Sequence, residues 1–347
     1  MTKKKLLSLL MLAILVLATV QVYNAYALWI DDWYWKDPYW LSAPKGMPDF
    51  DQNQVDANRC SPTATANSLW WFAAKAELDP TFRWARNLIP VFEGAQEWHD
   101  TNNVVPLIED LAERMSTTAD AGTSLSNWLS GIRKFLNEQN LGPGNHPITP
   151  ENPLGMYFYT GYKSQPTISW IEKELIKSED VMLSIELFAE IEIDHDSNPQ
   201  TPPIDTWVPY IKHAVTVAGV NSKAGMIGIS DPNLDRLEGA MGGDKDHAPH
   251  PDDPTLHNST NLVSHDKYEV INSPRGISVR SLVDYRTTTE FPVIEWRENI
   301  YDVKQWCAEV AWAIEASPIS PIPEPATMLL LGSGLLGLWG ARRKFKK

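Results

Sequence analysis

The hydrophobic period of the sequence changes near residue 180, and this change constrains the fold more than any other feature. Ahead of it, apolar residues recur every three or four positions, as in amphipathic helices, in segments 61–78, 105–115, 125–138 and 167–177. After it, apolar and β-branched residues typical of strands fill segments 181–193, 211–220, 226–230, 267–271 and 276–285. Helices followed by strands predict an α+β fold, with helices first and an antiparallel sheet after.

The N-terminus has the three parts of a secretory signal peptide. Lys3–Lys5 precede the apolar run 6–20, and Ala25-Tyr26-Ala27 is a small-x-small cleavage site. The pattern predicts that residues 1–27 are a signal peptide cut after Ala27, so that the mature chain works outside the cytoplasm. An uncleaved anchor helix is the alternative interpretation of the same run.

The C-terminus combines a proline-rich linker, an uncharged apolar run and a basic tail. The linker, 317–325, ends in Pro323, Glu324 and Pro325. The next 16 residues carry no charge, a little short of the ~20 that span the hydrocarbon core of a bilayer. The basic residues that follow, starting with Arg342 and Arg343, favour the cytoplasmic side. The sequence therefore predicts a single transmembrane helix with a basic tail within 326–347.

This order of Pro-Glu-Pro motif, short helix and basic tail resembles the PEP-CTERM sorting signal. In that family the signal is recognised by an exosortase, a membrane transpeptidase-like enzyme, and the chain is processed near the Pro-Glu-Pro. The resemblance implies exosortase and the membrane as partners, and export across the inner membrane of a Gram-negative bacterium that makes exopolysaccharide. The anchor would then be retained, or processed so that the chain reaches the cell surface or matrix. An ordinary tail anchor is the alternative interpretation.

The two basic ends hide how acidic the rest of the chain is. The sequence has 30 basic and 44 acidic residues, and eight of the basic ones belong to the two ends, which leaves 22 against the same 44. A body with a formal charge of −22 argues against nucleic-acid binding, because nucleic-acid-binding proteins concentrate lysine and arginine. A hydrophobic content of 43% excludes a fully disordered chain, and the presence of only two cysteines excludes a disulfide-stapled mini-protein.

Between the two ends we expect a short aromatic segment and one large domain. Residues 28–50 are rich in Trp, Tyr and Pro and are expected to form a strap over the body, with a sugar-stacking platform as the alternative. The domain is expected over 51–316, with an acidic insertion at 235–266. We interpret this insertion as a solvated loop, and a site for a hard cation such as calcium is the alternative.

Four residues form a candidate catalytic set. Cys60 stands where a helix is expected to begin, and the positive end of a helix dipole lowers a thiol pKa and favours the nucleophilic thiolate. His213 opens a predicted strand and is the candidate base. Asp231 ends the next predicted strand and is the candidate orienter of that base. Gln54, six residues before Cys60, is the candidate oxyanion donor.

These residues, with the proline shortly after Cys60 and the Asp-Pro at 231–232, resemble the papain-like cysteine peptidases. The most similar branch is the bacteriocin-processing type, which removes leaders that end in paired glycines. The resemblance covers residues 50–285 and implies a papain-like fold, with Gln54 at the oxyanion, Cys60 as nucleophile, and His213 and Asp231 as base and orienter. Ser61 stands where this family usually has glycine, a change that narrows backbone freedom at the oxyanion site.

The sequence thus predicts an exported, membrane-sorted papain-like thiol hydrolase, a cysteine peptidase that acts on peptide-type bonds of a peptide or protein substrate. It points to no cofactor and to no catalytic metal. Two alternatives remain open. In the first, the chain is a non-catalytic cell-surface or exopolysaccharide-matrix protein that uses the same scaffold for binding. In the second, Cys60 pairs with Cys307 in a structural disulfide, which can form in an exported chain.

Overall fold

The computed structural model of the protein describes residues 28–30, 33–36, 47–48, 50, 58–96, 101–143, 152, 155–177, 179–193, 204–232, 266–276, 278–283, 285 and 293–319. The predicted signal peptide, the Pro-Glu-Pro motif, the basic tail and the predicted transmembrane segment lie outside these residues, as does the acidic insertion except for Asp266. Within the described ranges, no helix has both the length and the apolar character needed to cross a bilayer.

The observed helices agree with the segments predicted from the helical period. They are α2 (Cys60–Leu78), α3 (Val104–Arg114), α4 (Leu125–Glu138) and α5 (Ile168–Ile176), with 3-10 helices η2 (Pro80–Ala85) and η3 (Thr101–Asn103). The side chains of Ser124 and Thr167 cap α4 and α5 by accepting backbone N–H groups of the first turn. Helix α2 differs, because its N-cap residue Arg59 makes no side-chain capping bond. Its first-turn amides are therefore not used by a cap.

Ten strands in the described part of the chain form one antiparallel sheet. They are β1 (Leu28–Ile30), β2 (Trp33–Trp35), β3 (Tyr157–Ser164), β4 (Asp180–Ile193), β5 (Ile204–Asn221), β6 (Met226–Ser230), β7 (Asp266–Asn272), β8 (Arg280–Leu282), β9 (Val293–Trp296) and β10 (Asn299–Ile319). The strand order is β1-β2-β5-β4-β10-β8-β7-β6, and β3 and β9 pair with β10. Because β6 also pairs with β5, the six strands from β5 to β6 along this path form a closed ring.

The predicted fold class is therefore wrong: the chain does not have a papain-like α+β fold with helices first and a sheet after. Strands dominate and close on themselves, β3 precedes α5, and the N-terminal hairpin β1–β2 joins the sheet through β5. Much of the difference comes from β10, a strand of 21 residues that the hydrophobic period did not reveal. It pairs with β3 and β4 through the same residues, so that Ile314 lies opposite both Tyr162 and Met182.

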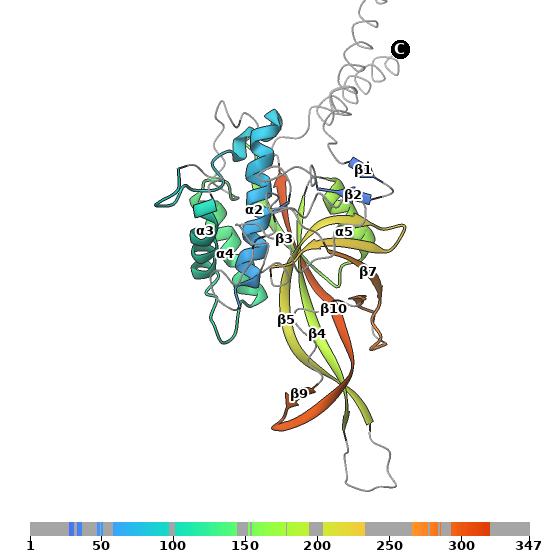
Figure 1. The fold of residues 1–347 in the computed structure, drawn as a ribbon. Coiled ribbons are helices and arrows are strands. Elements are labelled where there is room, and N and C mark those ends of the chain that lie inside the picture. Colours follow the sequence, from blue (N-terminus) through green and yellow to red (C-terminus); the bar gives the residue numbers. More distant parts are fainter. Residues whose placement is uncertain are drawn as a thin grey trace, which may run out of the picture.

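The sheet separates two apolar cores. Helices α2, α3 and α4 pack on one face, where Trp70, Phe72 and Phe158 are among the buried side chains (Figure 1). Helix α5 lies on the other side of β4 and β5, and a second cluster fills the space between the strands of the ring. Because side chains alternate along a strand, neighbouring residues of β5 point into different cores. The start of α2 thus comes close to the ring at β5.

The described residues of the segment 28–50 lie against this body. Trp33 and Tyr34 are buried, and the Lys36 amide donates to the Ala218 carbonyl at 2.9 Å. The Lys36 ammonium forms a buried ion pair with Asp180 and lies 5.0 Å from the Trp71 ring centroid. Burial, together with nearby Lys75, lowers the pKa of Lys36 well below its ordinary value. The N-terminal segment is thus fixed by backbone pairing and by a desolvated charge.

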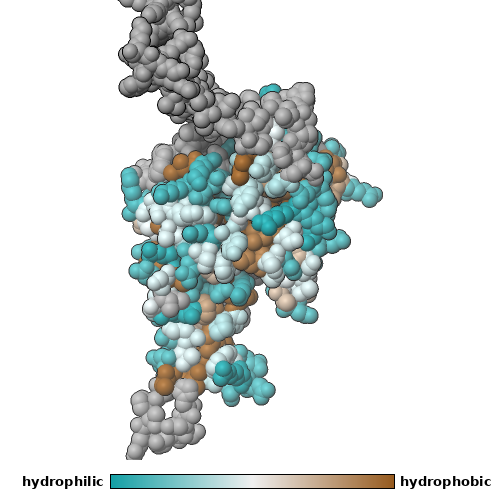
Figure 2. All heavy atoms as spheres, turned by 180° about the vertical axis from the view of Figure 1, so that it is seen from behind, coloured by the Kyte–Doolittle hydropathy of each residue, from teal (hydrophilic) through white to brown (hydrophobic). Residues whose placement is uncertain are grey.

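The far ends of β4, β5, β9 and β10 project beyond the body as a narrow arm (Figure 1). A small cluster that includes Ala189, Ile191 and Ile294 holds the arm together. Apolar side chains run along its surface (Figure 2), among them Ile204 and Ile300. The arm is thus stabilised by its own small core, apart from the two cores of the body.

Candidate functional site

Cys60, His213 and Asp231 meet where the start of α2 reaches the ring. Cys60 is the first residue of α2, His213 lies in β5, and Asp231 directly follows β6. The β5–β6 register brings Thr216 opposite Ser230, which places Asp231 beside this part of β5. His213 Nε2 lies 2.6 Å from Asp231 Oδ1, and the His213 ring also hydrogen-bonds the Cys60 thiol. The structure thus brings together three of the four predicted catalytic residues.

The electrostatics of this group favour a charge-separated state. Burial alone would lower the pKa of His213, but the charge and hydrogen bond of Asp231, aided by Cys60, raise it to about 10. Burial alone would raise the pKa of Cys60, but the hydrogen bond and charge of His213 outweigh it, and the net effect lowers that pKa. The lowered pKa of Cys60 and the raised pKa of His213 both favour an imidazolium beside a thiolate, held between Asp231 and α2.

The backbone around Cys60 also suits an anionic sulfur. The Ala214 amide and the Ser61 hydroxyl both hydrogen-bond the thiol, and both lower its pKa. Ser61 belongs to α2 and has ordinary helical geometry, so this position needs no glycine. The departure from the family pattern at Ser61 thus adds a donor and imposes no backbone strain.

Helix α2 is fixed to the ring by buried hydrogen bonds. Asn67 accepts from the Phe50 amide at 3.0 Å and donates to Ser230 Oγ at 3.1 Å, next to Asp231. Thr216 Oγ1 donates to the Ala64 carbonyl at 2.8 Å. These bonds set the distance between the helix that carries the thiol and the strands that carry its partners.

Gln54, the fourth predicted residue, lies outside the described residues, and its role as oxyanion donor stays a prediction. The described backbone offers its own donor, because the Cys60 amide lies in the first turn of α2 and the side chain of the N-cap residue Arg59 makes no capping bond there. A helix N-terminus favours negative charge. The Cys60 amide is therefore a candidate to stabilise an oxyanion next to the sulfur.

A cavity of about 410 Å³ opens beside Cys60 and His213. One wall is the segment between α3 and α4, which includes Gly122; the other includes Tyr210 and Trp312. The first wall is tied to the residues that precede Cys60, because Asn58 donates to the Ala119 carbonyl and adopts a left-handed backbone with φ 72°. The nucleophile therefore faces a space that can hold several atoms of a ligand.

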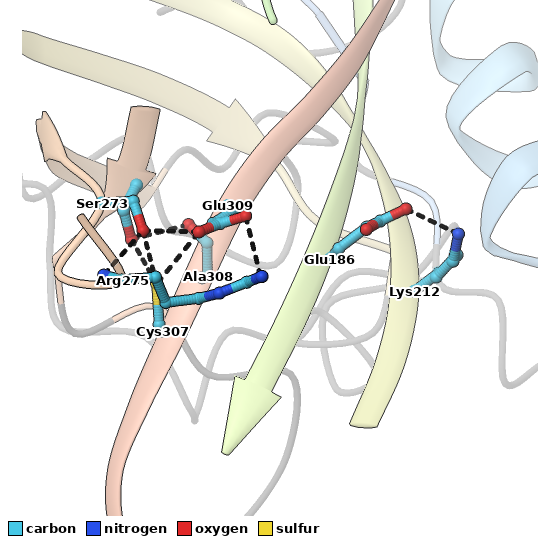
Figure 3. Close-up of polar contacts among 8 residues, drawn as sticks. Glu186, Lys212, Ser273, Arg275, Cys307, Ala308 and Glu309 are labelled. Atoms are coloured by element: carbon cyan, nitrogen blue, oxygen red, sulfur yellow. Dashed lines mark hydrogen bonds and ion pairs between the residues drawn. The ribbon is translucent and has the colours of Figure 1, made fainter. Parts of the chain in front are cut away.

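An ion pair lies at the edge of this cavity. Lys212 Nζ is 2.6 Å from Glu186 Oε1, and the two side chains extend toward each other from β5 and β4 (Figure 3). Both residues line the cavity. Because Lys212 is largely exposed, water screens this ion pair, and its contribution to the stability of the fold is small. The ion pair is a polar part of the cavity wall that a bound ligand can contact.

The second cysteine is separate from this site. Cys307 is buried in β10, and its sulfur lies 3.4 Å from Ser281 Oγ and 3.6 Å from Ser273 Oγ. Glu309 and Arg275 complete this polar cluster (Figure 3). Burial raises the pKa of Cys307, which keeps it a neutral thiol. Both cysteines are free in the structure, so the alternative of a Cys60–Cys307 disulfide is wrong for this fold.

One residue of the site was missed by sequence reasoning. The Tyr285 hydroxyl donates to Asp231 Oδ2 at 2.5 Å, on the oxygen that His213 does not use. Tyr285 is buried and belongs to the core inside the ring. Its sequence position, at the end of the predicted strand 276–285, carries no local pattern that marks it as a partner of Asp231.

A second group of titratable side chains lies away from the site. Glu174, Glu179 and Glu315 bring carboxylate oxygens within 4.8 Å of one another, and Lys177 Nζ is 2.7 Å from Glu174. Burial and the neighbouring Glu174 raise the pKa of Glu179 to about 8. Glu179 thus holds a proton in the folded chain at pH values where a free glutamate is ionised.

We expect this proton to make stability depend on pH. A raised carboxyl pKa contributes stability below its unfolded value, 4.5, that is lost as pH rises through the folded value near 8. The free energy of unfolding should therefore fall by up to about 1.4 kcal/mol per pH unit between these limits. In Glu179→Gln this part of the slope should vanish when urea unfolding is measured at pH 5 to 8. The exposed Glu77→Gln is the control, and equal slopes in all three proteins would contradict the assignment.

The comparisons with known proteins identify the C-terminus. Residues 321–344 match the PEP-CTERM protein-sorting motif, which confirms the predicted sorting signal. The chain is thus an exported protein that an exosortase sorts to the surface through a C-terminal membrane-anchored signal. The chain matches no curated protein and no solved structure. The match covers only the signal, so the chemistry of the body has to be argued from its own residues.

Proposed function

We propose that the exported body is a thiol-dependent hydrolase of amide-type bonds, with a peptide or protein as its substrate. The observation that supports this most is the contact of Cys60 with a histidine that is itself 2.6 Å from a buried carboxylate, at the wall of a cavity. A nucleophile, a base and a group that orients the base, each within hydrogen-bond reach of the next, is the arrangement that acyl transfer through a covalent intermediate requires.

Each residue has a defined step in this chemistry. The Cys60 thiolate attacks the carbonyl carbon and forms a C–S bond, while the carbonyl electrons move to oxygen. His213 gives its proton to the leaving amine as the C–N bond breaks. Water, deprotonated by His213, then hydrolyses the thioester and restores the thiol. Asp231 holds the imidazole throughout, and the Cys60 amide, with Gln54, stabilises the oxyanion.

The site itself argues for a reactive thiol over a structural one. A structural cysteine is buried and stays neutral, as Cys307 does because burial raises its pKa. Cys60 is instead partly exposed, lies beside a charged histidine and borders the cavity. Cys307 is therefore a reference thiol in the same chain, against which the reactivity of Cys60 can be compared.

The proposal is tested by the pH profile of alkylation, read at each cysteine by mass spectrometry of peptides. With iodoacetamide at pH 6 to 7, Cys60 should react faster than free cysteine, because the lowered pKa of Cys60 raises its thiolate fraction. Cys307 should stay unmodified in the folded protein. A Cys60 that reacts no faster than free cysteine would overturn the proposal and favour the alternative, a non-catalytic surface or matrix protein that uses this fold for binding.

A further inference from the structure

We propose that Tyr285 is a positioning residue of the Cys60 site: its hydroxyl holds the Asp231 carboxylate toward His213 and stabilises the net negative charge of the group. The inference rests on the proposed function, since it gives Tyr285 a role only where Cys60 works as a thiolate. Tyr285 does not line the cavity, and its hydroxyl donates to Asp231, so it acts through Asp231.

The geometry assigns the two oxygens of Asp231 to different donors. Oδ1 lies 2.6 Å from His213 Nε2, and Oδ2 accepts from the Tyr285 hydroxyl at 2.5 Å. Asp231 and Tyr285 are both almost fully buried. A buried carboxylate held at both oxygens cannot rotate without losing one bond, and an unpaired buried acceptor costs about 1–3 kcal/mol. Tyr285 therefore fixes the direction from which Asp231 meets the imidazole.

The Tyr285 hydroxyl also affects the charge of the Cys60 site. In the reactive state the group contains two anions, Cys60 and Asp231, and one cation, His213, and so carries a net charge of −1. The charged and titratable groups that face Tyr285 are Asp231, Cys60 and the neighbouring Tyr268. Burial raises the pKa of the Tyr285 hydroxyl most, and Asp231, Tyr268 and Cys60 raise it further. By the same interaction, a neutral hydroxyl that donates into the group stabilises its negative charge. Removing the Tyr285 hydroxyl should therefore raise the pH at which the group of Cys60, His213 and Asp231 takes up a proton.

Tyr285→Phe tests this directly, because it removes one oxygen and keeps the ring. We expect the midpoint of the Cys60 alkylation profile to move upward by about one pH unit, so that the alkylation rate on its acid side falls about tenfold. The readout is alkylation of Cys60, so the shift is expected whether or not a substrate is turned over. Failure of the hydrolase proposal, an unreactive Cys60 in the wild-type protein, is therefore a different result from failure of this one.

A matched control separates positioning from general loosening. The buried Tyr34 hydroxyl donates to the Leu175 carbonyl at 2.8 Å, and Tyr34→Phe also removes one buried tyrosine bond, but at a distance from the thiol. Tyr34→Phe should lower stability and leave the alkylation profile in place. Replacing Tyr285 by p-aminophenylalanine, which keeps an N–H donor, should restore the wild-type profile. A Tyr285→Phe profile that superimposes on the wild type, or one that Tyr34→Phe reproduces, would overturn the proposal.

Discussion

In His213→Ala, the thiolate fraction of Cys60 at pH 7 is expected to fall to about 1%, and its alkylation rate should fall by up to about 100-fold. The hydrogen bond and charge of His213 are the largest effects that lower the pKa of Cys60, and without them burial is left to raise it. A thiol whose pKa is about two units above the pH is roughly 1% ionised. Rates of iodoacetamide modification at Cys60, followed by peptide mass spectrometry from pH 5 to 10, check this expectation.

The control for this variant is Thr216→Val in the same strand. It removes the hydrogen bond from β5 to Ala64 of α2, and so weakens the contact between helix and strand without touching the sulfur. If the rate falls equally in both variants, loosened packing explains the loss. If the rate in His213→Ala stays at the wild-type level, the imidazole does not set the charge of Cys60 and the proposed mechanism fails.

Asp231→Ala should have the largest effect on stability, a loss of about 3–5 kcal/mol in the free energy of unfolding at pH 7.5. Removing one partner of a buried ion pair leaves the other charge uncompensated, and here His213 and the Tyr285 hydroxyl both lose their acceptor. Urea unfolding followed by circular dichroism measures the loss. Asp205→Ala is the matched control, because Asp205 pairs with Lys304 on the exposed arm and should contribute little.

The contribution of the His213–Asp231 ion pair to the free energy of unfolding should also depend on pH. Whether it rises or falls with pH depends on the pKa shifts of both His213 and Cys60. The raised pKa of His213 adds stability below 6.5 that is lost as pH rises through about 10. The lowered pKa of Cys60 adds stability above 9 that is lost as pH falls through the folded value. Above pH 9 only the His213 trend remains, so the difference between wild type and Asp231→Ala should narrow between pH 9 and 10. A difference that grows between pH 9 and 10 would contradict the charge assignment.

Local elements could be predicted from the sequence because their signals are local. Helix α4 begins and ends at the predicted residues, and β6 does as well, since each has an apolar period over its whole length. Strand β10 gave no such signal. Lys304 and Gln305 lie in its exposed first half and Pro318 near its end, while only its middle is continuously buried. Which strands pair, and that the ring closes, depends on contacts between distant residues, and this is why the fold class could not be predicted.

The candidate site likewise has residues that can be predicted from the sequence and contacts that cannot. Cys60 begins a helix and Asp231 ends a strand, and such positions at element ends are visible in a sequence. The contact of Tyr285 with Asp231 joins residues 54 positions apart, and no spacing rule predicts a tyrosine hydroxyl at that carboxylate. Ser61, which looked like a defect against the family pattern, hydrogen-bonds the thiol, and only the geometry of the helix start shows this.

The end of β10 limits how far the folded body can lie from the sorting signal. Its last residue, Ile319, is hydrogen-bonded into the sheet opposite Tyr157, and the sorting motif begins at residue 321. Pro323 lies four positions after Ile319, and a fully extended chain covers at most about 14 Å over that length. While the signal holds the chain at the membrane, the end of the sheet at Ile319 is therefore tethered within a few residues of the sorting motif.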